Sequence, residues 1–93
     1  MDTKYIVAAY ASGENSELFK SEFVYANHAA AALSYFRYLV DKVRHGAQLV
    51  DCMKSYIRNT DRVTREMQLY GEIDERPILV TIVITKAAEA NGV

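Results

Sequence analysis

The chain has 93 residues and a mass of 10.5 kDa, which leaves room for one domain, residues 1–93, and excludes a second. Its composition, 51% hydrophobic and 25% charged with four Gly and one Pro, is that of a globular protein and excludes disordered, collagenous and low-complexity chains. The net charge of -1 gives no overall attraction to nucleic acid or anionic membranes, so either partner would need a local patch.

The single cysteine, Cys52, cannot form an intramolecular disulfide, whereas small domains in oxidising compartments usually carry several. The first residues lack the basic region and long apolar stretch of a signal peptide. The most apolar stretch, from Ile78 to Ile84, is far shorter than the roughly 20 residues that a membrane-spanning helix needs. We therefore expect a soluble, cytoplasmic protein without a membrane partner.

The N-terminal part of the chain predicts two strands. Residues 4–11 are rich in β-branched and aromatic types, and residues 12–16 are turn formers, which indicates a strand followed by a hairpin loop. In residues 19–25 larger apolar side chains alternate with charged and smaller ones, the pattern of a strand with one wet face. We expect Phe19 and Phe23 to point into the core.

A helix is predicted next, with Asn27 as its N-cap and Gly46 just past its last turn. Basic Arg44 and His45 suit the negative end of the helix dipole. On a helical wheel one face is apolar, and we expect it to be buried: Ala29, Ala32, Leu33, Phe36, Leu39, Val40 and Val43.

Residues 47–58 fit two structures. Their apolar spacing suits a helix, but the turn formers at 59–61 favour a hairpin that joins a strand there to a strand over 62–70. We favour the strand. An acidic turn over 71–77 and a final strand over 78–85 complete the prediction.

Residues 87–93 lack an anchor and are expected to fray. The predicted order is β-β-α-β-β-β, with residues 47–58 helical as the alternative. This order indicates the α+β class, a small antiparallel sheet with one main helix across one face.

The sequence holds no recognisable catalytic, cofactor or metal motif. His28 and His45 would lie roughly 25 Å apart on the helix, so they cannot share a metal site. The thiol of Cys52 has no partner that the spacing identifies, and a small buried hydrophobic role suits it better than catalysis. No phosphate-binding glycine loop and no acid and base pair of carboxylates is recognisable. We expect no metal, no cofactor and no enzyme activity.

Charge is distributed unevenly along the chain. Residues 37–65 hold seven basic and three acidic residues, a local balance of +4 that leaves -5 for the rest. In a hairpin over 55–65, Arg58 and Arg62 would flank the tip, and Tyr56 could stack on a base or a cation. The alternative is that Arg37 pairs with Asp41 along the helix and the hairpin arginines are solvated.

Tyrosine is the second unusual feature, with seven residues and no Trp. Tyr38 lies on the polar face of the predicted helix and Tyr35 at its margin, where the rings could contact a partner or lie on their own helix. In the final strand Leu79 and Val83 point away from the other apolar residues. A second copy of the chain or residues 47–53 would cover them, and we expect a homodimer.

These observations favour a non-catalytic binding protein that docks a protein partner. The expected contact residues are aromatic or basic: Tyr35, Arg37, Tyr38, Arg44, Tyr56, Arg58, Arg62 and Arg65. In size and pattern the chain resembles accessory proteins of phages and mobile elements, among them inhibitors of host defence complexes. The alternatives are a nucleic-acid-binding module that uses the basic segment 37–65, and a small enzyme that uses Cys52.

Overall fold

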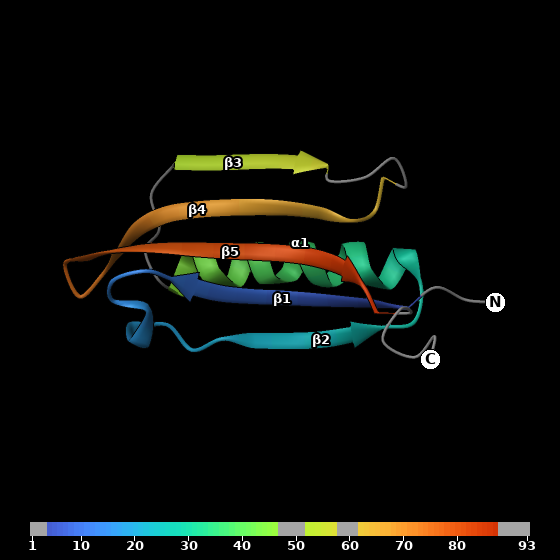
Figure 1. Cartoon of the computed structure of the whole chain (residues 1–93), viewed down its shortest axis with the longest axis horizontal. Helices are drawn as coiled ribbons and strands as arrows, with labels where there is room; N and C mark the ends of the chain where they lie inside the picture. The colour runs from blue at the N-terminus through green and yellow to red at the C-terminus, as the bar shows by residue number, and fades with distance from the viewer. Residues whose placement is uncertain (1–3, 47–51, 58–61, 88–93) are drawn as a thin grey trace.

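The computed structural model describes residues 4–46, 52–57 and 62–87, with the backbone alone described for 52–57. One helix lies across a five-stranded antiparallel sheet, so the predicted α+β class and element order are confirmed (Figure 1). The elements are β1 (Tyr5–Ser12), a short 3-10 helix η1 (Ser16–Leu18), β2 (Glu22–Ala26), α1 (Ala29–Gly46), β3 (Cys52–Ile57), β4 (Arg65–Ile73) and β5 (Arg76–Lys86).

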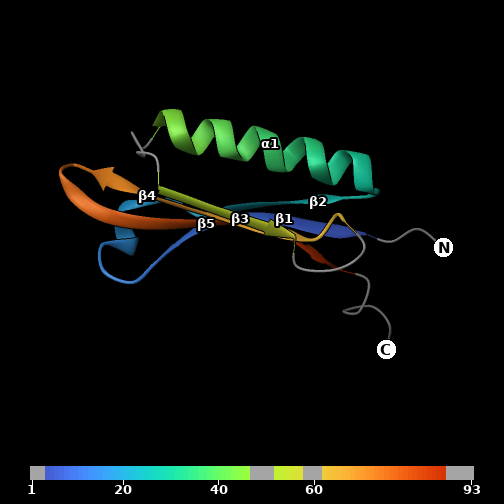
Figure 2. The same cartoon turned by 90° about the horizontal axis from the view of Figure 1, so that it is seen from above.

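The strand order in the sheet is β2-β1-β5-β4-β3, which places the last strand in the middle. Ile82 of β5 pairs with Ala9 of β1 on one side and with Met67 of β4 on the other. Side chains alternate between the two faces of a sheet, so these three residues share one face. We call it the helix-side face, because α1 packs on β1, β5 and β2 there (Figure 2). Within the described residues, neither α1 nor a strand stacks on the opposite face, which we call the open face (Figure 2).

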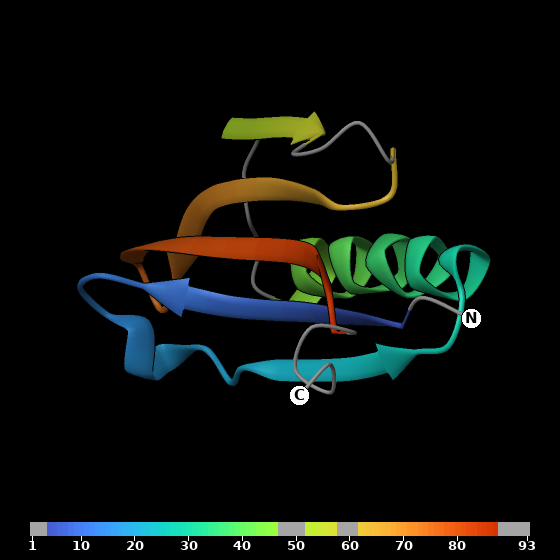
Figure 3. The same cartoon turned by 45° about the vertical axis from the view of Figure 1, so that its right-hand side comes forward.

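The core lies between α1 and the helix-side face. The predicted inner face of the helix is confirmed, because Ala32, Phe36, Leu39, Val40 and Val43 are buried and Ala29 and Leu33 are partly buried. Beneath the helix β1 and β2 contribute small side chains beside Tyr5 and Val7, and Ala9 and Ala26 are almost fully buried. Small side chains on both layers allow the helix to approach the sheet closely. β3 lies beyond the helix, at the far edge of the sheet (Figure 3).

The helix begins one residue later than an Asn27 cap would give, so that prediction was wrong. His28 is the residue before the helix, and its ring Nδ1 accepts a hydrogen bond of 3.2 Å from the backbone N–H of Ala31. At the other end the ring of His45 donates from Nδ1 to the carbonyl of Asp41 at 2.7 Å. His28 therefore satisfies a backbone N–H that the start of a helix leaves without a partner, whereas His45 bonds to a carbonyl inside the last turns of α1.

The expected orientation of β2 was wrong. Phe23 is 60% exposed and lies on the open face, whereas Val24 and Ala26 face the helix. Phe19 lies before the strand and is partly buried against the core, so the prediction that it points into the core is confirmed in part. The physical reason is size, because Phe23 and Tyr25 beneath the helix would hold it away from β1.

Residues 52–57 form a strand, which confirms the favoured alternative there; residues 47–51 and Arg58 lie outside the described residues. β3 pairs with β4 from Ile57 opposite Arg65, so Arg62 belongs to the loop and not to the predicted strand. Since residues 52 and 53 extend the far edge of the sheet, they do not cover β5.

The acidic turn is shorter than predicted and consists of Asp74 and Glu75 alone. Both have positive φ, 52° and 64°, and Ile73 pairs directly with Arg76. Two central residues with positive φ define a type I′ hairpin turn. The final strand correspondingly starts at Arg76, before Pro77.

The predicted fraying does not include Ala87. Its side chain is buried and its N–H donates to the carbonyl of Lys4 at 2.8 Å, which extends the pairing of β5 with β1. Residues 88–93 lie outside the described part of the chain. No helix within the described ranges is both long enough and apolar enough to cross a membrane.

Candidate functional site

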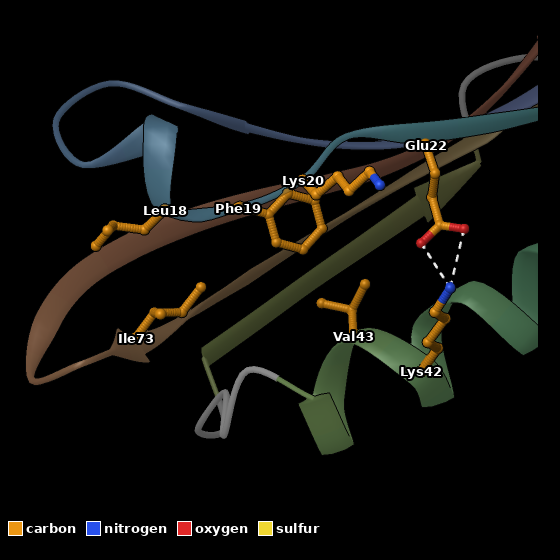
Figure 4. A pocket seen from close by; sticks show the side chains of 7 residues that line it. All are labelled: Leu18, Phe19, Lys20, Glu22, Lys42, Val43 and Ile73. Atoms are coloured by element: carbon orange, nitrogen blue, oxygen red, sulfur yellow. Dashed lines mark hydrogen bonds and ion pairs between the residues drawn. The ribbon is translucent and has the colours of Figure 1, made fainter.

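An open pocket of about 460 Å³ lies between the C-terminal half of α1, the segment before β2 and the end of β4 (Figure 4). Its apolar wall is formed by Leu18, Phe19, Val43 and Ile73, and its polar side by Lys20, Glu22 and Lys42. This composition suits an apolar group, with charged side chains at the margin to orient what enters.

The loop after β1 positions Leu18 and Phe19 at this pocket. Asn15 adopts a left-handed conformation, with φ of 68°, and its carbonyl accepts from the N–H of Leu18 at 2.9 Å. The side chain of Asn15 donates from Nδ2 to the carbonyl of Pro77 at 2.8 Å. Since this bond joins the loop to the start of β5, the pocket wall is anchored to the middle strand of the sheet.

An ion pair fixes the polar side of the pocket. Nζ of Lys42 lies 3.0 Å from Oε2 of Glu22 and also donates to Oε1 at 3.2 Å (Figure 4). The hydrogen bond and then the charge of Glu22 raise the pKa of Lys42 above its ordinary value of 10.5, because both favour the ammonium form. The same Nζ lies 5.9 Å from the ring centre of Tyr38, within the range of a cation–π contact. Tyr38, 57% exposed, is thereby joined to the pocket.

The structure places four predicted contact residues on the outer surface of α1. Tyr35 is 42% exposed, and Arg37 and Arg44 are exposed as well as Tyr38. Arg37 and Asp41, both described, form no ion pair with each other, so the predicted pairing along the helix is wrong.

The predicted basic residues do not gather at one place. Arg65, where β4 begins, donates from Nη2 to the carbonyl of Arg62 at 2.6 Å and from Nε to that of Val63 at 3.2 Å. β4 begins at the end of the sheet where α1 begins, whereas Arg44 is in the last turn of α1, at the opposite end (Figure 1). Arg65 thus supports its own loop, and Arg44 lies far from it.

The structure does not describe the side chains of two predicted contact residues, Tyr56 and Arg58. Backbone pairing sets Tyr56 opposite Glu66, at an open-face position, but its side chain lies outside what the structure describes, as does Arg58 altogether. The same holds for the thiol of Cys52. No group of three metal-ligating side chains occurs in the part of the chain where side chains are described.

The largest exposed apolar side chains of the sheet lie on the open face. They are Tyr10, Phe23, Tyr25 and Tyr70. The rings of Phe23 and Tyr25 meet edge to face, with centroids 5.8 Å apart and an interplanar angle of 84°. Between these aromatics, Leu79 and Val83 of the middle strand point away from the helix as predicted, but Leu79 is partly buried and Val83 is buried within the chain.

Sequence reasoning missed the pocket, because its residues come from three segments that only the fold brings together. One signal was present: Glu22 has the same phase in β2 as buried Ala26, so the strand period places a charged residue beside the helix. A basic partner on the helix, such as Lys42, is the expected response to that charge. No protein-family model matches this chain, and comparisons with the curated proteins and with the solved structures give no match either.

Proposed function

We propose that this protein is a non-catalytic binding protein that docks a protein partner on the surface formed by the pocket and Tyr38. The observation that carries the proposal is the apolar pocket bordered by a fixed ion pair, next to an exposed aromatic ring. A partner would insert an apolar side chain against Leu18 and Phe19 and would cover the ring of Tyr38.

This arrangement has the physical features of a binding hot spot. Tyrosine contributes a large contact area at low cost in conformational entropy, and such residues dominate binding energy when they lie beside a pocket that excludes water. The ion pair holds Lys42 and Glu22 in place before a partner arrives, which lowers the ordering cost of association. In the same proposal the partner is a host complex, and the protein is an accessory protein or inhibitor encoded by a phage or mobile element.

The experiment is capture from a nuclease-treated lysate on immobilised protein, followed by binding measurements with the purified partner. Tyr38→Ala should weaken that binding by about 10-fold or more, as expected for a hot-spot residue. Its melting temperature should hardly change, because the ring is exposed. Tyr35→Ala is the matched control, since Tyr35 is exposed on the same helix, whereas the ring of Tyr38 contacts Lys42 at the margin of the pocket.

Equal binding by the wild type and by Tyr38→Ala, with Tyr35→Ala also unchanged, would contradict the proposed surface. Capture that succeeds from untreated lysate and is lost from nuclease-treated lysate would favour the nucleic-acid alternative with its basic segment 37–65. In that case the logarithm of affinity should fall steeply with the logarithm of salt concentration, by nearly one unit for each phosphate neutralised. Arg37→Ala combined with Arg44→Ala should then reduce the slope.

A further inference from the structure

The open face of the sheet carries four exposed aromatic side chains. Phe23 and Tyr25 are 60% and 66% exposed, and Tyr10 and Tyr70 are 39% and 50% exposed. These aromatics flank the middle strand, where Leu79 is partly buried and Thr81 and Val83 are buried within one copy. Large exposed aromatic side chains gathered on one face of a small protein mark an interaction surface.

The charge of the open face suits a neutral partner surface. Its charged positions in the described residues, apart from the undescribed side chains of β3, are Lys4 at one end of β1 and Glu66 and Glu72 on β4. Nucleic acid would require a concentration of basic side chains around the aromatics. The face instead carries nearly balanced charge at its margins and uncharged side chains in its middle.

We infer that the open face is the interface of a homodimer in which two sheets stack face to face with the helices outside. Five strands spaced about 4.8 Å apart give a width of roughly 24 Å, and eight residues of β1 give a length of roughly 27 Å. The face therefore measures about 650 Å² in each copy, or about 1,300 Å² in total, within the range of stable interfaces. Each copy keeps its pocket and Tyr38 on the outside, so this inference does not depend on the proposed function.

The test is the mass in solution by size-exclusion chromatography with light scattering, over about 1 to 100 μM protein, concentrations that bracket micromolar dissociation constants. The wild type should have twice the chain mass of 10.5 kDa at the upper end. Phe23→Glu should give the mass of one chain, because each dimer would bury two carboxylates. The double variant Phe23→Thr with Tyr25→Thr keeps strand propensity and should also be monomeric.

The control is Tyr35→Glu, which adds the same charge on the outer surface of α1 and should leave the dimer intact. Circular dichroism shows whether each variant is folded. A wild type with the mass of one chain at 100 μM, a concentration at which a micromolar dimer is mostly associated, would overturn the inference. Folded variants at Phe23 and Tyr25 that stay dimeric would overturn it too, because they would place the contact elsewhere.

Discussion

Lys42 and Glu22 connect the helix to an edge strand: Nζ of Lys42 lies within 3.2 Å of both carboxylate oxygens of Glu22. Glu22 belongs to the helix-side face of β2, where its neighbours Val24 and Ala26 contribute to the core. The pair therefore closes the boundary between core and solvent, and the same two side chains form the polar side of the pocket.

The ion pair predicts the titration of Lys42. Its pKa is raised by Glu22, so the pair stabilises the fold fully below the ordinary value of 10.5 and the contribution is lost as pH rises through the higher folded value. The chemical shift of the Lys42 side-chain carbon next to Nζ should report the raised pKa, and Glu22→Gln should return it towards 10.5. Equal titration in both proteins would show that the pair does not persist in solution.

His28 is expected to stabilise the start of α1 through its ring nitrogen. Replacing it with Ala should lower the free energy of unfolding by about 1 kcal/mol, because the N–H of Ala31 loses its acceptor. His28→Asn should retain most of the stability, since asparagine is a good N-cap. Urea denaturation measures both variants, and Asn27→Ala is the control. A greater loss of stability for Asn27→Ala than for His28→Ala would show that Asn27, and not His28, caps the helix.

The type I′ turn offers a stabilising substitution. Glu75 has a φ of 64°, a region that costs a side chain roughly 1–2 kcal/mol, and glycine adopts it freely. Glycine also makes the unfolded chain more flexible, which offsets about 0.5–1 kcal/mol of the gain. Glu75→Gly should therefore raise the free energy of unfolding by about 0.5–1 kcal/mol. Glu72→Gly, in the adjoining strand, should lower it; two changes of the same sign would refute the turn assignment.

Arg65 should behave as a structural residue. Its guanidinium donates to the carbonyls of Arg62 and Val63, so Arg65→Met should destabilise the fold by about 1–2 kcal/mol through the loss of both bonds. Arg37→Met, at an exposed position on α1, should change stability by less than about 0.5 kcal/mol. Equal unfolding midpoints in urea for the two variants would mean that the two hydrogen bonds of Arg65 do not stabilise the fold.

The helix was predicted well because its signal is long. Eighteen residues repeat the apolar period often enough to identify every inward position from Ala29 to Val43. The two faces of β5 were equally clear, because one face of the segment from Ile78 to Ile84 is wholly apolar and the other carries Thr81 between Leu79 and Val83.

The phase of β2 could not be predicted from its own residues. Apolar side chains occur at both phases, and the larger ones, Phe23 and Tyr25, face outward. Which phase is buried depends on how closely α1 approaches the sheet. The buried alanines Ala9, Ala26 and Ala32, on three different elements, leave room for a close approach. The pocket could not be predicted for a related reason. The β4–β5 pairing brings the end of β4 beside the loop before β2, and only this pairing places Ile73 at the pocket. Local pattern indicates that a strand exists, and tertiary packing decides which face is buried.

The place of β5 in the middle of the sheet has a consequence for how the chain folds during synthesis. β1 pairs with β5 across a sequence separation that runs from Tyr5 to Lys86, and β4 pairs with β5 on its other side. Until β5 has left the ribosome, no strand joins the β1–β2 hairpin to the β3–β4 hairpin. The helix then lacks β5, one of the strands on which it packs. Contacts so distant in sequence form slowly, so the nascent chain exposes Val7 and Leu69 until the last strand arrives, and a chaperone that shields these strands should raise the yield of folded protein.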